Sequence, residues 1–433
     1  MQTKLNQIIV KAKQDKRLKF TSLAHLINEE NLAKCYSELK RNKACGIDEM
    51  TVAEYGVNLK ERLNLLIEAM KSKRYQPQPV KRVYIPKAGT DEKRGLGIST
   101  VEDKLVQIML KKILESIYEV DFLDCSYGFR PNRSCHQAVN ALDKAVMRKP
   151  INFVVEVDIR KFFDNVQHDW MMRCVEERIK DPNVLWLIKR FLKAGVTDAG
   201  RYESTELGTP QGGVISPLLA NIYLHYVLDV WFEKKIKPQA KGYMQLIRYS
   251  DDFVVCCESE VDAKLFLESL TERLMKFGLE VSAEKTKIIK FGKRAWQLAT
   301  KQGGKCESFN FLGFTHHGAK SRYGKLVMGH KTSKENLSRK LKETKEWIKA
   351  IRNLVPLKEW WPILKAKLVG HFNYFGISGN YRCLKQFYIN VKWAAFKWIN
   401  RRSQKKSMNM KDFNRYMQFN PLPEPRICYS LYT

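Results

Sequence analysis

Several absences in this 433-residue chain narrow its class before any motif is considered. No run of roughly 18 apolar residues occurs, so we expect no membrane span, and no apolar stretch follows Met1 that would form a signal peptide. None of the ten cysteines forms a Cys-x-x-Cys pair, which argues against a zinc module or a disulfide framework and favours reduced thiols. No low-complexity segment or evident internal repeat is present. At this length, two or three globular domains are expected.

Acidic residues are scarce relative to basic ones. Asp and Glu total 46 against 77 Lys and Arg, which gives a formal net charge of +31 and a pI near 9.7. A globular chain this basic most often binds a polyanion. Nucleic acid is therefore the first expected partner, and an anionic membrane surface is the second. A basic surface that serves solubility alone is the remaining interpretation, although solubility favours acidic residues.

The excess positive charge is concentrated towards the C-terminus. Residues 320–406 carry 22 Lys and Arg against four acids, with aromatic residues interleaved. Cations there can meet phosphates while aromatic rings stack on bases, although most of the rings could equally be core residues. From about residue 330 the apolar spacing predicts amphipathic helices over 332–352, 360–375 and 384–400.

The N-terminal part predicts helices followed by a basic β-hairpin. Residues 1–70 are basic and have near-helical apolar spacing. The proline-containing segment 75–79 cannot lie inside a helix. Residues 80–86 then alternate as a strand, residues 87–97 predict a hairpin tip and a returning strand, and residues 101–118 predict a helix.

Two apolar, β-branched segments carry aspartates. The first, 153–158, ends in Asp158, and the second, 246–257, has Asp251 and Asp252 in its middle. A buried strand seldom carries Asp unless the charge is paired or bound to a metal. Adjacent strand side chains point to opposite faces, so a turn or bulge is needed for both to converge. The pair alone could be a plain turn; with Asp158 it predicts a site for two Mg²⁺ ions roughly 4 Å apart.

A glycine-rich stretch lies between these two segments, over residues 206–222. It contains the string Glu-Leu-Gly-Thr-Pro-Gln-Gly-Gly-Val-Ile-Ser-Pro. A glycine-rich loop that opens a helix lets the backbone approach a nucleotide closely. Such turns are common, but the full string between the two aspartate segments is specific.

In this order the motifs resemble those of reverse transcriptases, and in detail those of the reverse transcriptase/maturases encoded by bacterial group II introns. The resemblance implies an α/β right-hand polymerase, with fingers and palm over 1–315, including an N-terminal extension over 1–70. It further implies an α-helical thumb/maturase domain over 316–406 and a short tail over 407–433 without a nuclease domain. The segments that carry the resemblance are 42–48, 77–87, 94–98, 127–131, 153–164, 206–222, 247–255, 279–287, 311–314, 368–376 and 398–406.

The resemblance implies roles for individual residues at the reaction centre. Asp158, Asp251 and Asp252, with the backbone carbonyl of Ile159, would hold two Mg²⁺ ions, for which Mn²⁺ could substitute. Phe163 would lie under the sugar and exclude the ribose 2′-hydroxyl.

Further roles concern the nucleotide, the primer and RNA. Gln211 would touch the incoming nucleotide, and Lys87 and Arg94 would hold its triphosphate. Lys285, with Lys287 as an equal contender, would protonate pyrophosphate. Lys87, Arg94 and Lys285 could also be ordinary surface cations. The primer grip is expected at Phe311, Leu312 and Gly313, and RNA binding at Arg401, Arg402, Lys405 and Lys406.

The implied function is that of an RNA-directed DNA polymerase which also assists splicing and mobility of its intron RNA. Its partners would be template and intron RNA, a DNA primer and target, and dNTPs, with no membrane, in a bacterial cytoplasm and at the nucleoid when it acts on DNA. Two alternatives stay open: a domesticated reverse transcriptase in host defence or DNA repair, and a non-catalytic RNA-binding splicing factor. Ser250 stands where the family usually has Ala, and we expect activity to survive this change. Without a nuclease domain, DNA integration would depend on another strand-opening event, such as replication.

Overall fold

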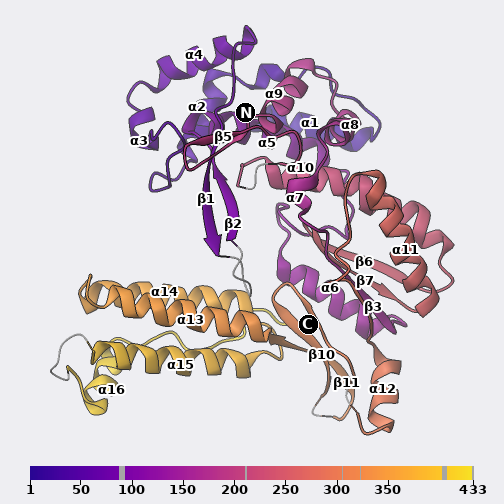
Figure 1. Cartoon of the computed structure of the whole chain (residues 1–433), viewed down its shortest axis with the longest axis vertical. Helices are drawn as coiled ribbons and strands as arrows, with labels where there is room; N and C mark the ends of the chain where they lie inside the picture. The colour runs from indigo at the N-terminus through magenta and orange to yellow at the C-terminus, as the bar shows by residue number, and fades with distance from the viewer. Residues whose placement is uncertain (87–92, 210–211, 305, 322, 402–406, 432–433) are drawn as a thin grey trace. The chain divides into compact units, whose positions relative to one another are not determined.

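The computed structural model of the chain is mixed α/β and divides into two units (Figure 1). The first unit comprises the described residues of 1–135 and 155–288, and the second those of 136–154 and 289–431. Within the described ranges, no helix is both long and apolar enough to cross a membrane. The structure describes residues 1–86, 93–209, 212–304, 306–321, 323–401 and 407–431.

The central helix of the first unit is α5 (Val101–Tyr118), and it confirms the helix predicted over 101–118. The Thr100 side chain caps it by accepting a hydrogen bond from the Asp103 N–H at 3.1 Å. Its apolar residues recur at helical spacing and are almost completely buried. The other helices of this unit are α1 (Gln2–Gln14), α2 (Glu29–Ser37), α3 (Val52–Tyr55), α4 (Leu59–Lys71), α7 (Phe162–Asn165), α8 (His168–Glu176), α9 (Pro182–Leu192), α10 (Ser216–Leu224) and α11 (Glu260–Lys276), with the short turns η1 (Ala24–Leu26), η2 (His225–Asp229), η3 (Phe232–Ile236) and η4 (Lys237–Gln239).

One four-stranded sheet of the first unit has the order β2-β1-β4-β5. Strands β1 (Val80–Pro86) and β2 (Lys93–Ile98) are antiparallel, and Figure 1 shows this hairpin projecting from the helices. β1 also pairs in parallel with β4 (Val196–Asp198), which forms a hairpin with β5 (Arg201–Glu203). The strand predicted over 80–86 is confirmed, whereas the expected hairpin tip lies outside the described residues.

A second four-stranded sheet has the order β6-β7-β3-β8. It consists of β6 (Met244–Tyr249), β7 (Asp252–Cys257), β3 (Phe153–Val157) and β8 (Lys287–Lys290), and the division between the units passes through β3 and β8. The segment predicted as one strand over 246–257 is therefore a hairpin of two strands. The break is the turn that the aspartate pair was expected to require.

The second unit contains a small antiparallel sheet and a group of long helices. In Figure 1 the helices α13, α14 and α15 run lengthwise beside one another, and Trp360 and Trp361 are among their fully buried side chains. The three helices confirm those predicted from the spacing. Their bounds are α13 (Lys334–Ile351), α14 (Leu357–Phe375) and α15 (Tyr381–Ile399), and the shorter helices are α6 (Cys135–Arg148), α12 (Lys293–Lys301) and α16 (Met410–Phe419).

The sheet of the second unit has the order β11-β10-β9. Its strands are β9 (Phe309–Phe311), β10 (Phe314–Lys320) and β11 (Leu326–Thr332). The segment expected to be helical from residue 316 thus opens with the greater part of a β-hairpin. Phe314 and His316 alternate with less buried neighbours, which is the period of a strand.

Candidate active site

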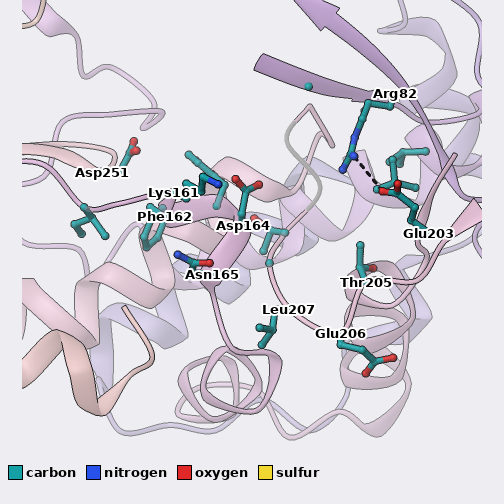
Figure 2. Close-up of a pocket in the computed structure, with 18 of the residues that line it drawn as sticks. Arg82, Lys161, Phe162, Asp164, Asn165, Glu203, Thr205, Glu206, Leu207 and Asp251 are labelled. Atoms are coloured by element: carbon teal, nitrogen blue, oxygen red, sulfur yellow. Dashed lines mark hydrogen bonds and ion pairs between the residues drawn. The ribbon is translucent and has the colours of Figure 1, made fainter. Parts of the chain in front are cut away.

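A cavity of about 750 Å³ in the first unit gathers side chains that are far apart in the sequence. Asp158, which directly follows β3, and Asp251, in the β6–β7 turn, both lie on its wall. In Figure 2, Asp251 lies on one side and the Arg82–Glu203 pair on the other. Other lining residues are Tyr84 and Lys93 from β1 and β2, Ile159, Lys161, Phe163 and Asp164 around α7, and Lys285.

The turn between β6 and β7 places Asp251 on the cavity wall. Tyr249 and Asp252 are opposite each other in the antiparallel register, so Ser250 and Asp251 form a two-residue turn. Ser250 has a φ of 60°, a left-handed conformation that costs a non-glycine residue about 1–2 kcal/mol. Asp252 begins β7 with an exposed side chain and is not part of the cavity lining. The structure therefore brings Asp158 and Asp251 to one cavity and leaves Asp252 beside it.

Arg248, which is completely buried, holds this turn. Its Nη1 donates to the Ser250 carbonyl at 2.9 Å and to Asn221 Oδ1 at 3.0 Å. Its Nε and Nη2 form a bidentate ion pair with Asp229 at 2.7 and 2.5 Å, and Nη2 also donates to Ser126 Oγ at 2.8 Å. All five guanidinium N–H donors thus have an acceptor. This network was not predicted from the sequence, although a charged residue inside an apolar strand was the available signal.

Asp158 is fixed through its backbone. Its N–H donates to Thr286 Oγ1 at 3.4 Å, and its carbonyl accepts from the Ser282 N–H at 2.8 Å. Its carboxylate Oδ2 lies 3.2 Å from Lys285 Nζ, and both side chains are about half exposed. Ile159, whose backbone carbonyl was expected to bind a metal, lines the same cavity.

The donor atoms fit a hard divalent ion in type, because Mg²⁺ prefers carboxylate oxygens. In the part of the chain that the structure describes, however, no group of three or more His, Cys, Asp or Glu side chains is gathered as a ready metal site. Asp158 and Asp251 are two of the carboxylates on the cavity wall, which also carries Asp164, Glu203 and Glu206. Burial raises the pKa of the nearby Glu156 carboxyl to about 7; the Lys287 charge opposes this rise and the Asp158 charge adds to it.

The glycine-rich segment begins with a loop clamped onto α7. Gly208 has a φ of 85°, and a Cβ there would lie 2.7 Å from the Phe163 carbonyl oxygen and 2.9 Å from that of Asp164. The Gly208 N–H donates to the Val166 carbonyl and the Thr209 N–H to the Phe163 carbonyl, both at 2.8 Å. Only glycine permits this approach, which fixes Phe163 on the cavity wall.

The wall formed by β1 and β2 contributes two cations, Arg82 and Lys93, that were not predicted as site residues. Val80, Arg82 and Tyr84 are every second residue of β1, so their side chains lie on the same face of the strand, and this face lines the cavity. Arg82 Nη1 donates to Glu203 Oε2 at 3.1 Å, and Lys93 of β2 lines the same wall. The alternation in the predicted strand was the signal that could have identified Arg82.

Several predicted contacts cannot be placed beside this wall. Lys87 and Gln211 lie outside the described residues, and Arg94 is part of β2 without a described side chain. Of the expected RNA-binding residues, Arg401 is described, and its guanidinium carbon lies 5.7 Å from the Trp398 ring centroid. The remaining ones, Arg402, Lys405 and Lys406, lie outside the described residues.

The expected primer grip is the turn between β9 and β10 in the second unit. Phe311 and Phe314 are paired, so Leu312 and Gly313 form a two-residue turn with φ values of 51° and 80°. Positive φ at both positions is typical of a type I′ hairpin. The Tyr374 hydroxyl donates to the Leu312 carbonyl at 3.1 Å, which ties the turn to α14.

Comparison with known proteins gives consistent matches. Residues 85–316 match the family model described as reverse transcriptase (RNA-dependent DNA polymerase). Group II intron-encoded protein LtrA of Lactococcus lactis subsp. cremoris is 36% identical over 286 residues, which cover 63% of this chain and 47% of LtrA. Protein YkfC of Escherichia coli (strain K12) is 31% identical over 314 residues, 65% of this chain and 78% of YkfC. An uncharacterized 91 kDa protein in the cob intron of Schizosaccharomyces pombe is 30% identical over 318 residues, 61% of this chain and 38% of that protein. The chain thus spans less than half the length of LtrA.

Proposed function

The chain belongs to the reverse transcriptase family, and we propose that it copies RNA into DNA by adding deoxynucleotides to the 3′ end of a primer. The observation that carries this proposal is that Asp158 and Asp251 line the same cavity, together with the cations Arg82 and Lys93. Carboxylates suit metal-assisted attack by a hydroxyl, and cations suit a triphosphate.

We propose that the cavity takes two Mg²⁺ ions, with Mn²⁺ as a substitute, on Asp158, Asp251 and the Ile159 carbonyl, with Asp252 as the adjacent ligand. When bound, such ions would activate the primer hydroxyl and neutralise charge on the phosphates. The nature of the oxygen donors supports this proposal.

The chain's own side chains would orient the nucleotide. Phe163, fixed by the Gly208 loop, would lie under the sugar and exclude a 2′-hydroxyl. Lys285 Nζ lies 3.2 Å from Asp158 Oδ2, and we propose this amino group as the proton donor to the leaving pyrophosphate. Lys87, Arg94 and Gln211 remain the proposed contacts of the triphosphate and base.

We further propose the right-hand arrangement implied by the motifs. Fingers and palm would occupy 1–315, the thumb/maturase domain 316–406 and the tail 407–433. The turn at 311–313 would grip the primer, and basic residues over 401–406 would bind RNA.

The biological role is proposed from similarity to LtrA, whose name identifies it as a group II intron-encoded protein. We infer that this chain likewise reverse-transcribes an intron RNA and assists its splicing and mobility, with template and intron RNA, a DNA primer or target and dNTPs as partners. Its place of action would be the cytoplasm, at the nucleoid when it acts on DNA.

Primer extension tests the catalytic part of the proposal. An RNA template annealed to a DNA primer, with dNTPs and Mg²⁺, should give extension that a chelator abolishes and Mn²⁺ restores. Phe163→Val should raise the rate of ribonucleotide incorporation relative to deoxynucleotide incorporation about tenfold, which corresponds to about 1.4 kcal/mol in discrimination. Tight RNA binding without extension under any metal would contradict the proposal and favour a non-catalytic splicing factor.

A further inference from the structure

A second cavity of the first unit, of about 380 Å³, lies between α9 and the segment 76–79. Three cations line it, Lys189, Arg190 and Lys193, together with the rings of two aromatic residues. None of the described residues on its lining is acidic. The cavity therefore combines positive charge with flat apolar surface, and nothing in the polymerase mechanism uses it.

This cavity lies on the opposite face of the β2-β1-β4-β5 sheet from the active-site cavity. Glu203 lines the active-site cavity, whereas Tyr202, its neighbour in β5, lines the second one. Successive side chains of a strand point to opposite faces. Pro79, directly before β1, lines the second cavity, and Val80, the first residue of β1, lines the active-site cavity. A ligand of the second cavity is thus separated from the catalytic aspartates by a layer of backbone.

The two aromatic rings of the second cavity are held in place. Tyr202 is 59% exposed, and its ring packs so closely over Gly195 that a Cβ there would lie 2.4 Å from it. Trp186 has the Lys73 ammonium 4.5 Å and the Arg190 guanidinium 5.5 Å from its ring centroid. These contacts hold the exposed Tyr202 ring and the Arg190 guanidinium in place, so a ligand that binds them causes little further loss of side-chain conformational entropy.

We propose that this second cavity binds a nucleotide of single-stranded nucleic acid, with the base on Tyr202 and the phosphates on Lys189, Arg190 and Lys193. The cavity is within the size range of small-ligand sites, and cations without carboxylates select a polyanion. An open ring adds stacking that favours an unpaired base over a duplex backbone. The strand is either the 5′ overhang of a template whose duplex occupies the active site or a separate RNA strand, and both present the same chemistry.

The test measures binding of a short fluorescein-labelled oligouridylate by anisotropy over a series of salt concentrations. Tyr202→Ala should weaken binding about tenfold, which is within the range measured for base stacking. The triple variant Lys189→Gln/Arg190→Gln/Lys193→Gln should lower the salt slope by about 2, since each single-strand phosphate contact contributes about 0.7. The matched control Lys234→Gln/Lys235→Gln/Lys241→Gln removes the same charge from exposed positions of the same unit that line neither cavity.

Equal losses in the test and control triples, or an unchanged Tyr202→Ala, would overturn the proposal. Primer–templates with and without a 5′ overhang identify the source of the strand. If the overhang raises affinity and Tyr202→Ala abolishes this gain, the bound strand is the template. If Tyr202→Ala weakens binding of the free oligouridylate alone, the bound strand is a separate RNA. Asp251→Asn should leave oligouridylate binding intact, so failure of this inference is distinguishable from failure of the polymerase proposal.

Discussion

The turn that carries Asp251 should depend on Arg248, and Arg248→Met is the perturbation that exposes this dependence. The substitution leaves the Asp229 carboxyl, which is 0% exposed, without its ionic partner and removes donors from Asn221, Ser126 and the Ser250 carbonyl. Removing one partner of a buried ion pair typically costs about 3–5 kcal/mol. Native proteins have only about 5–15 kcal/mol of stability in total, so the urea midpoint should fall substantially.

A double variant separates stability from positioning. Arg248→Met/Asp229→Leu removes both charges, and apolar replacement of a buried pair is often neutral or stabilising. We expect the urea midpoint to recover, whereas primer extension should stay at least about tenfold below wild type, because the Ser250 carbonyl still lacks its donor. Extension that recovers in step with stability would refute the positioning role. A loss below about 1 kcal/mol in Arg248→Met would refute the reasoning from buried charge.

Three further perturbations have defined outcomes. Ser250→Ala removes a buried hydroxyl that has no hydrogen-bond partner among the described residues. Urea unfolding should therefore show equal stability or a gain of about 1 kcal/mol, with unchanged primer extension. A marked loss of stability or of extension would contradict this. Gly208→Ala places a Cβ against the Phe163 carbonyl oxygen and should lower primer extension. The control Gly200→Ala has a similar φ of 84° but, beyond its chain neighbours, no atom of the described residues within 4 Å of the new Cβ, so it should lose only the stability that a left-handed non-glycine residue costs. Equal extension by the two variants would contradict the role of Gly208 in fixing Phe163. Burial, with a smaller contribution from the Lys340 charge, lowers the pKa of His371 to about 4. As pH falls from about 6.5 to 4, the unfolded chain therefore binds a proton at His371 that the folded chain does not, so the free energy of unfolding decreases. At pH 5 this decrease is about 2 kcal/mol, and His371→Phe should abolish it in urea unfolding measured over a series of pH values. An unchanged pH dependence in the variant would contradict this reasoning.

Local regularities were predictable from the sequence. The strand over 80–86 and the helix over 101–118 have the expected bounds because alternation, proline and a Thr100 cap are all local signals. The three long helices near the C-terminus follow from their apolar spacing in the same way. The motif order also identified Asp158 and Asp251, which the fold brings to one cavity.

Features that depend on long-range contacts or unusual backbone were not predictable. A turn or bulge was expected at the aspartate pair, but the left-handed conformation of Ser250 was not, because neither Gly nor Asn marks that position. The β10–β11 hairpin buries His316 and His330, whose Nδ1 atoms lie 2.9 Å apart, so polar residues occupy inward positions and obscure the alternation. Arg248 reaches Ser126 across 122 positions of sequence, a contact that no local pattern encodes.

The most direct test of the active-site assignment compares Asp251→Asn with Asp124→Asn in extension of a primer on an RNA template. Both changes remove one carboxylate charge from the first unit, but the Asp124 side chain is 95% exposed and lies outside the cavity lining. We expect Asp251→Asn to abolish extension and Asp124→Asn to extend the primer at the wild-type rate, with equal urea midpoints for the two variants. Wild-type extension by Asp251→Asn would contradict the claim that this cavity is where DNA is made.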